Sequence, residues 1–237
     1  MWERSELKAD AKVDLKGFYW LSFVVCLIAG ILGGATSGAS SSVSFLTTSG
    51  DSVFSETSNV FSPLLATILG VVFLFAFVFA VLFTAFVTNP VSVGKCRFFV
   101  HMNADERDIA TLFSAFRKGS YISVVKTMIL TDLFIFLWSL LFIIPGIVKS
   151  YSYRMVPYIL TENPNLHYKE ALEISRDMTK GVKFDMFILD LSFIGWYLLG
   201  AMAFGIGTLF VSPYVEATWA QLYLRLRERI NYNTIPA

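Results

Sequence analysis

The sequence predicts an all-α polytopic membrane protein, and two observations carry that prediction. The 237 residues are 55% apolar and only 16% charged, with a mean hydropathy of +0.62, whereas soluble domains carry about 25% charged residues. Several uncharged runs also approach or exceed the roughly 20 residues that an α-helix needs to cross the hydrocarbon of a bilayer. We therefore expect one integral membrane domain over residues 1–237, built as a bundle of helices.

Four segments are predicted as spans from their apolar runs alone. Residues 18–36 and 63–87 contain no charged residue, and Pro63 opens the second run at a first-turn position that favours proline. Residues 121–144 and 184–210 are also long and apolar, although each contains a few charges. The first run is not expected to be a cleaved signal peptide, because its basic leader is long and no A-x-A site follows it.

Basic residues predict how the chain is threaded, because cytoplasmic loops keep an excess of Lys and Arg. Residues 1–17 and 88–120 are rich in these residues, whereas the Ser- and Thr-rich segment 37–62 has none. We therefore expect the N-terminus inside and 37–62 outside, as a flexible solvated loop.

The same rule predicts two further spans. With only four spans, residues 149–183, which hold six basic residues, would lie outside. We therefore expect 145–160 to be a return helix of about 22 Å that begins with an outer turn at its Pro-Gly pair. By the same reasoning, Pro213 turns the chain into a last span at 212–228.

The predicted topology has six spans arranged as three hairpins, with both termini cytoplasmic. No Lys or Arg then falls in an outside loop, and the protein is expected in the cell membrane. The expected spans are 18–36, 63–87, 121–144, 145–160, 184–210 and 212–228. The expected cytoplasmic segments are 1–17, 88–120, 161–183 and 229–237.

Two cytoplasmic segments show helical periodicity. Residues 108–118 place Ile109, Leu112, Phe113 and Phe116 at helical spacing. This helix lies either in the inner interface of the bilayer or against the cytoplasmic end of the bundle. Residues 166–180 predict an amphipathic helix whose apolar face holds Ala171, Ile174, Ser175 and Met178. Its polar face is either simply solvated or a contact for a soluble partner.

Away from the ends of the predicted spans, the sequence places a set of intramembrane charges: Asp132, Lys149, Arg154, Asp190 and Glu216. Each costs about 2.5–3.5 kcal/mol at the centre of an isolated span, so such residues normally face the protein interior and pair. Lys149 and Glu216 follow their prolines by four and three residues, which predicts similar depths and a mutual pair. Asp190 or Asp132 would then meet Arg154. The network is either structural or a polar pathway or ligand site.

Small residues recur at every fourth position in Gly30, Gly34 and Gly38. This spacing allows helices to approach closely. It is interpreted either as packing within the chain or as the seam of a homodimer.

The sequence offers little for catalysis. It contains no HExxH motif, no Gly-rich phosphate loop and no histidine in a predicted span. His101 and His167 lie in polar, charge-rich segments and make a poor metal site, and Cys26 and Cys96 do not suggest a disulfide framework. A net charge of +1 gives no case for nucleic-acid binding. We therefore expect no enzymatic activity, no catalytic residue, no cofactor and no metal.

Three segments resemble a known family: PGIVKSYSYRMVPYIL, then ALEISRDMTKG, then FILDLSFIGWYLLGAMAFGIGTLFVSPYVEAT. They are similar to an uncharacterised family of multi-pass membrane proteins from Gram-positive bacteria, domain-of-unknown-function family 975. The resemblance covers roughly residues 1–228, and its specific part is 143–220. It implies a multi-pass bundle in the cytoplasmic membrane, and it implies no activity.

Two functions of different class follow from the sequence. One is a transporter-like protein or accessory subunit that handles a small or amphiphilic molecule, such as a lipid. The other is a structural or regulatory scaffold that docks a cytoplasmic partner through the helices 108–118 and 166–180. Beyond the bilayer itself, the expected partners are therefore a small-molecule or lipid ligand, a protein partner or a second copy of the chain.

Overall fold

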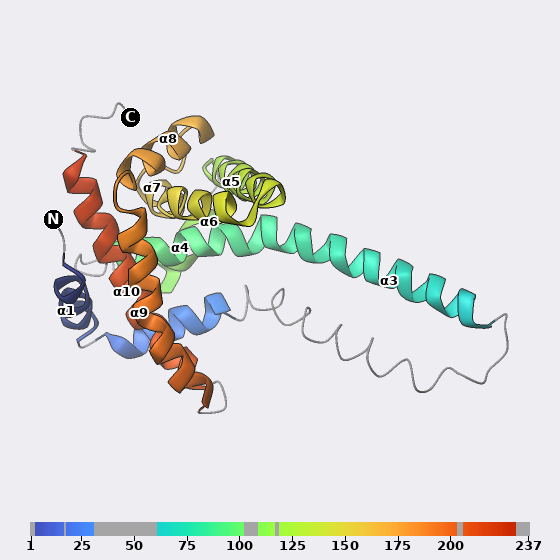
Figure 1. Cartoon of the computed structure of the whole chain (residues 1–237), viewed down its shortest axis with the longest axis horizontal. Coiled ribbons are helices and arrows are strands. Elements are labelled where there is room, and N and C mark those ends of the chain that lie inside the picture. The colour runs from blue at the N-terminus through green and yellow to red at the C-terminus, as the bar shows by residue number, and fades with distance from the viewer. Residues whose placement is uncertain are drawn as a thin grey trace.

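Every described secondary-structure element is a helix, as the sequence predicts. The computed structural model describes residues 3–16, 18–30, 61–101, 109–116, 119–202 and 206–230 (Figure 1). The helices are α1 (Arg4–Leu15), an unlabelled helix (Tyr19–Gly30), α3 (Phe61–Phe83), η1 (Thr84–Thr88), α4 (Asn89–Val100), η2 (Ile109–Phe116), α5 (Tyr121–Leu141), α6 (Ile143–Ser152), α7 (Val156–Glu162), α8 (Tyr168–Met178), α9 (Lys183–Met202) and α10 (Ile206–Arg229).

The second predicted span is part of a longer helix. The helix α3 continues through the π-helical turn η1 into α4, so the chain stays helical beyond residue 87, where the span was expected to end. Pro90 lies at the start of α4 and lacks the N–H that would bond four residues back. The carbonyl of Phe86 instead accepts a hydrogen bond of 2.7 Å from the Tyr121 hydroxyl. The π-turn and this hydroxyl together let the helix pass through the proline.

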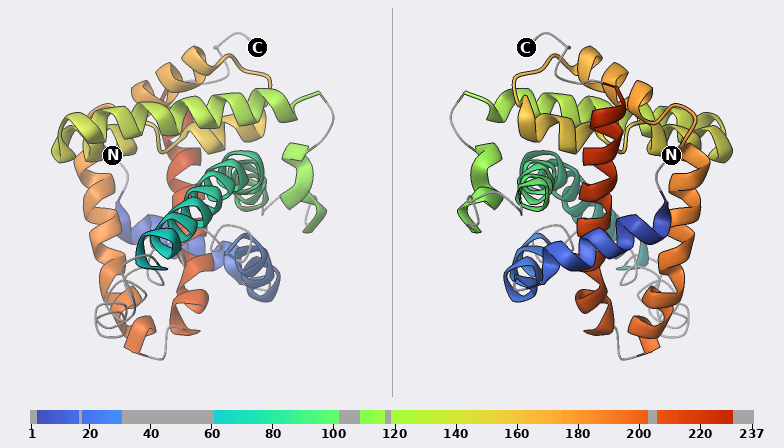
Figure 2. Two further views of the ribbon diagram at one scale, coloured as in Figure 1. Left: turned by 90° about the vertical axis from the view of Figure 1, so that its right-hand side faces the viewer. Right: turned by 90° about the vertical axis from the view of Figure 1, so that its left-hand side faces the viewer.

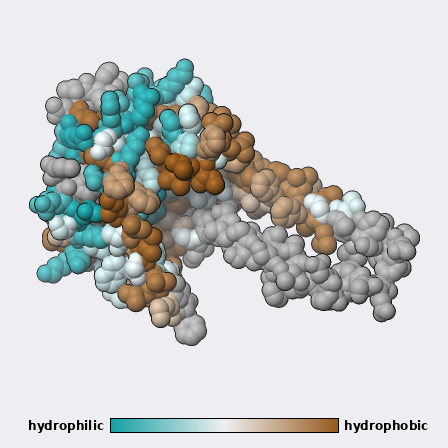
Figure 3. Space-filling model, viewed as in Figure 1, coloured by the Kyte–Doolittle hydropathy of each residue, from teal (hydrophilic) through white to brown (hydrophobic). Residues whose placement is uncertain are grey.

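The helix α3 projects from the body as a long arm, and its side chains are exposed. Its apolar residues from Ile68 to Leu82 are almost all about half exposed or more, up to 76% for Phe75. Figure 3 shows this arm as a continuous apolar surface leaving a more polar body. A helix that is apolar all round needs an apolar environment, such as lipid.

The core lies between α1, α4, α7, α8 and α10. Its largest fully buried side chains include Trp219 and Tyr223 of α10, and the ring of Tyr223 stacks on Tyr158 of α7 at 5.3 Å between centroids. The helix α1 contributes Leu7, and the 3₁₀-helix η2 contributes Leu112. This core brings the N-terminal and C-terminal helices together (Figures 1 and 2).

The helices α5 and α6 form a tight hairpin, but its turn is not where we expected it. The two helices are joined by Phe142, whose backbone is extended. Pro145 instead lies within the first turn of α6, where its missing N–H costs nothing. Gly146 then allows the close approach of the two helices, because a Cβ there would lie 2.4 Å from Ser139 Oγ. The helix expected over 145–160 is also in two pieces, α6 and α7.

The helices α9 and α10 form a second hairpin that is closed by two glycines. A Cβ on Gly200 would lie 2.7 Å from the backbone nitrogen of Thr208, and one on Gly207 would lie 2.6 Å from Gly200 Cα. The expected turn at Pro213 is wrong, because Pro213 lies inside α10. The carbonyl of Phe210, three residues before the proline, accepts a hydrogen bond from the Tyr19 hydroxyl at 2.7 Å, so a second helix stabilises the backbone near Pro213.

The long helices do not run parallel to one another. In Figure 1 the arm α3 extends horizontally and α9 runs vertically, and in Figure 2 the helix α5 runs crosswise to both. Two described helices, 67–100 and 121–141, are long and apolar enough to cross a membrane, or three if the bent pair α1 and Tyr19–Gly30 forms one span. The described structure thus gives two or three candidate spans where the sequence predicts six.

Candidate functional site: polar contacts of the helical core

An ion pair crosses the interior of the body between α4 and α10. Lys95 Nζ lies 2.6 Å from Glu216 Oε1, and the two side chains are 22% and 23% exposed. At this depth the attraction is screened less than at the surface. The prediction that Glu216 pairs with Lys149 is therefore wrong.

Lys149 instead lies against aromatic rings. Its Nζ stands 4.8 Å from the ring centroid of Trp138 on α5 and 5.6 Å from that of Tyr153. The prediction failed because Pro145 does not mark the turn, and because the α5–α6 hairpin runs crosswise to α10 rather than beside it (Figure 2). Equal spacing from two prolines therefore did not mean equal depth.

The two aspartates have neutral partners. Asp132 accepts a hydrogen bond of 2.8 Å from the Asn89 amide, and Asp190 accepts one of 2.9 Å from the Tyr151 hydroxyl. Neither makes the predicted ion pair with Arg154. The predicted intramembrane charges are thus distributed over the body, and no hydrogen bond or ion pair joins one of the five to another in the described residues.

Arg154 stacks on a tryptophan of the core. Its guanidinium carbon lies 4.4 Å from the ring centroid of Trp219, which is a cation–π geometry. The Trp219 side chain is buried, and within the described residues its indole Nε1 has no hydrogen-bond partner. A buried polar atom without a partner is uncommon and calls for an explanation.

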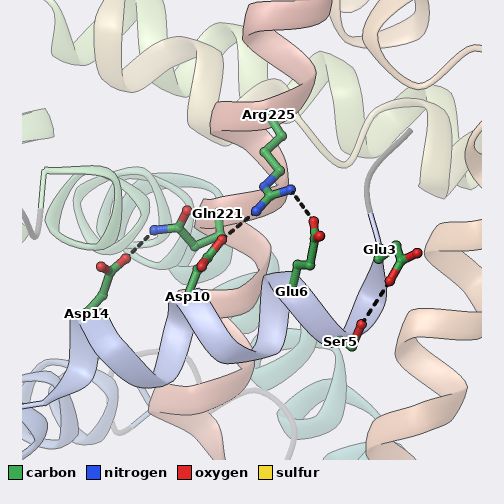
Figure 4. Close-up of polar contacts among 7 residues, drawn as sticks. All are labelled: Glu3, Ser5, Glu6, Asp10, Asp14, Gln221 and Arg225. Carbon is green, nitrogen blue, oxygen red and sulfur yellow. Dashed lines mark hydrogen bonds and ion pairs between the residues drawn. The ribbon is translucent and has the colours of Figure 1, made fainter.

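A row of polar contacts fastens α1 to α10 (Figure 4). Arg225 lies 3.0 Å from Glu6 and 2.5 Å from Asp10, and Gln221 donates to Asp14. These acidic residues recur at every fourth position of α1, and Gln221 and Arg225 are also four apart. Sequence reasoning missed this contact, although the matching periods of the two helices are a signal that could have found it.

The amphipathic face predicted for 166–180 is confirmed. Ala171, Ile174, Ser175 and Met178 are all buried in α8. Ser175 Oγ donates a hydrogen bond of 2.8 Å to the backbone oxygen of Ser152, which joins α8 to α6. The opposite face of α8 is exposed and carries charges of both signs.

The segment 109–116 packs on the body through one side. Leu112 is buried, and Gly94 of α4 lies so close that a Cβ there would stand 1.8 Å from the Leu112 carbonyl oxygen. Of the two expected positions for this segment, the structure shows contact with the chain's own helices. Phe113 and Phe116 remain 48% and 36% exposed.

The glycine stripe finds no packing partner in the described part of the chain. A Cβ added at Gly30 would meet nothing within 4 Å, whereas Gly34 and Gly38 lie outside the described residues. The close helix contacts instead involve Gly94, Gly146 and the Gly200–Gly207 pair.

Lys8 is a partly buried base outside the predicted spans. Its Nζ donates to Ser192 Oγ at 2.8 Å and lies 4.5 Å from the Phe193 ring centroid. Partial burial lowers its pKa, and repulsion from Arg4 and Lys12 lowers the pKa further. Among the described residues, no group of three His, Cys, Asp or Glu side chains is arranged to hold a metal ion.

These features define an all-helical protein with apolar helices of membrane-spanning length and a core tied together by polar contacts. Residues 140–230 match the model of the family DUF975, described as a protein of unknown function. The matched segment runs from the end of α5 through α10, and we assign it to that family, as the resemblance predicted. No curated protein and no solved structure matches the chain.

Proposed function

We propose that this protein is a non-enzymatic integral membrane protein that serves as a scaffold in the cell membrane. One observation carries the proposal: large apolar side chains of α3, α5 and α9 are exposed, while charged groups of the body are satisfied by other side chains of the chain. The apolar surface calls for lipid, and satisfied networks of polar side chains favour a rigid body. A scaffold needs both properties.

The proposed topology places both termini and the basic segments on the cytoplasmic side. The sequence prediction of six spans is one threading that meets this condition. The contacts of Arg225 with α1 support it, because they hold the N-terminal helix beside the last turns of α10. Because α1 and the end of α10 are in contact, the proposed arrangement keeps both on the same side of the bilayer.

The helix α8 is the proposed docking element. Its apolar face is buried in the body, and its charged face is solvent-exposed, with the residues Lys169, Glu170, Glu173, Arg176 and Asp177. A mixed-charge surface on a rigid helix suits a soluble protein partner that presents the complementary pattern.

Cysteine labelling tests the topology. Ser175 is buried, so Glu173, which is 65% exposed, is the better reporter. We expect Glu173→Cys to react with an impermeant maleimide only in opened cells, and Ser52→Cys to react in intact cells. Reaction of Glu173→Cys in intact cells would refute the topology.

Photo-crosslinking in cells tests the docking element. A photoreactive residue at Glu173 is expected to give a discrete protein adduct that Arg176→Glu abolishes, while the same probe at exposed Leu140 of α5 gives no such adduct. If neither position gives a protein adduct, the scaffold proposal fails.

A second candidate is the handling of a small or amphiphilic molecule. The specific observation in its favour is the buried Trp219 indole without a partner in the described residues, together with Glu216 on the same helix, α10, whose ion pair with Lys95 of α4 is partly exposed. Mass spectrometry of small molecules that copurify with the protein tests it. A species present with the wild type and lost with Glu216→Gln would favour this function over the scaffold.

A further inference from the structure

The tip of the α5–α6 hairpin is exposed and apolar on all sides. From Leu133 to Val148 there is no charged residue. The five residues at the turn are each at least 63% exposed: Leu140, Leu141, Phe142, Ile143 and Ile144. Water is a poor environment for such a surface.

Close packing and local hydrogen bonds hold the tip together. Ser139 packs against Gly146 across the hairpin, and its hydroxyl donates to the Ile135 carbonyl at 2.8 Å. Irregular backbone at membrane depth is tolerated where neighbouring protein covers it, and here the turn is a single extended residue, Phe142.

Each arm of the tip is too short to cross a bilayer. Asp132 bounds the apolar stretch on α5 and Lys149 bounds it on α6, ten residues before and seven after Phe142. At about 1.5 Å per residue, the arms reach roughly 10–15 Å, which is half of the roughly 30 Å of hydrocarbon or less.

The polar boundary of the tip resembles a membrane interface. Lys149 Nζ lies over the rings of Trp138 and Tyr153, and the Tyr151 hydroxyl bonds to Asp190 at 2.9 Å. Tryptophan, tyrosine and lysine gather at the level of lipid headgroups. This boundary lies on the body side of the hairpin, where α6 ends.

The direction of the hairpin argues against a crossing. Figure 2 shows α5 running crosswise to the arm α3, which carries the longest apolar surface of the described chain. One planar bilayer cannot have both helices along its normal. If α3 crosses along the normal, the α5–α6 hairpin does not cross in the same direction.

We infer that the α5–α6 hairpin is a re-entrant membrane element whose tip is covered by lipid acyl chains. The inference rests on the proposed membrane location and deepens it: one hairpin replaces the two spans predicted at 121–144 and 145–160. The basic residues of 149–183 stay cytoplasmic, which was the reason for predicting a return span.

Labelling of the tip in intact and opened cells tests the inference. In a Cys26→Ala/Cys96→Ala background, the reporters are Ile143→Cys at the tip, Ser52→Cys as the outside control and Glu173→Cys as the inside control. Ile143 is 77% exposed in the chain, so the substitution is not expected to disturb folding. We expect Ile143→Cys to react no more than background with an impermeant maleimide, whether the cells are intact or opened. Ser52→Cys should react in intact cells, and Glu173→Cys should react only in opened cells.

Fluorescence in liposomes identifies what covers the tip. A nitrobenzoxadiazole probe on Ile143→Cys of the purified protein, attached in detergent before reconstitution, is expected to emit as in an apolar medium and to lose intensity with brominated lipids. The same probe on Glu173→Cys is expected to be insensitive to these lipids. Leu140→Cys, on the other arm, is expected to behave like Ile143→Cys.

The possible results separate cleanly. Labelling of Ile143→Cys from outside would show that the hairpin crosses, and labelling only from inside would show that the tip is in water. Protection without quenching by brominated lipids would mean that protein, including a second copy, covers the tip. Each of these results overturns the inference. Release of the whole protein by alkaline carbonate would instead overturn the proposed membrane location itself.

Discussion

Lys95 shows that a count of basic residues does not reveal the partner of any one of them. Counting basic residues assigned it to a cytoplasmic segment, because the apolar run ends before it. In the structure the helix continues to Val100 and carries Lys95 to Glu216. Lys and Arg counts report the side of the membrane for a segment, and they do not report whether one member of it turns inward.

The Lys95–Glu216 pair is expected to couple the stability effects of its two residues. Removal of one partner of a buried pair typically costs about 3–5 kcal/mol because the other charge is left uncompensated, and partial exposure should bring the loss to about 3 kcal/mol or less. We expect Lys95→Met to destabilise the protein more than Lys95→Met with Glu216→Gln does. Thermal unfolding in detergent measures the cycle.

The control for this cycle is Lys169→Met on the exposed face of α8, which should change stability little. Additive losses from the two single substitutions at Lys95 and Glu216 would mean that the pair contributes no coupling.

At the scale of elements, one glycine decides whether η2 can dock on α4. Gly94 is buried, and its Cβ position would lie 1.8 Å from the backbone oxygen of Leu112. Backbone cannot move aside as a flexible side chain can. No periodicity marks this glycine, because the contact depends on where a distant segment packs.

Gly94→Ala is therefore expected to destabilise the protein by about 1–3 kcal/mol, the usual range for overpacking. The matched control is Gly195→Ala in α9, where a Cβ would meet nothing within 4 Å; it should be neutral or stabilising by up to about 1 kcal/mol from helix propensity. Thermal unfolding of both variants checks this. Equal effects would contradict the predicted backbone clash.

The ion pairs of Arg225 with Glu6 and Asp10, which fasten α1 to α10, are expected to weaken with salt. Their side chains are 32–56% exposed, and each such ion pair is worth only about 0.2–1 kcal/mol. Raising the salt to about 1 M shortens the screening length to roughly 3 Å. Trypsin should then cleave α1 at its lysines faster.

Arg225→Gln should accelerate this cleavage at low salt and abolish its salt dependence. Arg176→Gln, which removes the exposed pair with Glu173 on α8, is the control and should leave cleavage of α1 unchanged. A salt dependence that persists in Arg225→Gln would mean that other charges hold α1 in place.

At the scale of the whole molecule, the exposed arm α3 is expected to depend on lipid. Phe75→Lys places a charge on a side chain that is 76% exposed, and a lysine at the centre of a span costs about 2.5–3.5 kcal/mol. We expect a smaller fraction of the protein to resist carbonate extraction. Phe113→Lys on η2, which is 48% exposed, should have a weaker effect, and equal losses would argue against an arm in lipid.

The sequence by itself determined the class of structure and several of its faces. Apolar runs and periodicity predict helices because a chain must satisfy its backbone hydrogen bonds locally in lipid. The buried face of α8 was readable in this way. These properties depend on neighbours three or four residues away.

Only the tertiary structure decided which residues meet. Pro145 and Pro213 look like turns in the sequence, but each is accommodated inside a helix, and the turn of the first hairpin falls at Phe142. Lys149 consequently lies against aromatic rings, while Lys95 forms the ion pair with Glu216. A proline's local cost can be offset by a hydroxyl from another helix, as Tyr121 does for the Phe86 carbonyl. Depth and pairing therefore depend on contacts between distant segments, and local spacing alone does not set them.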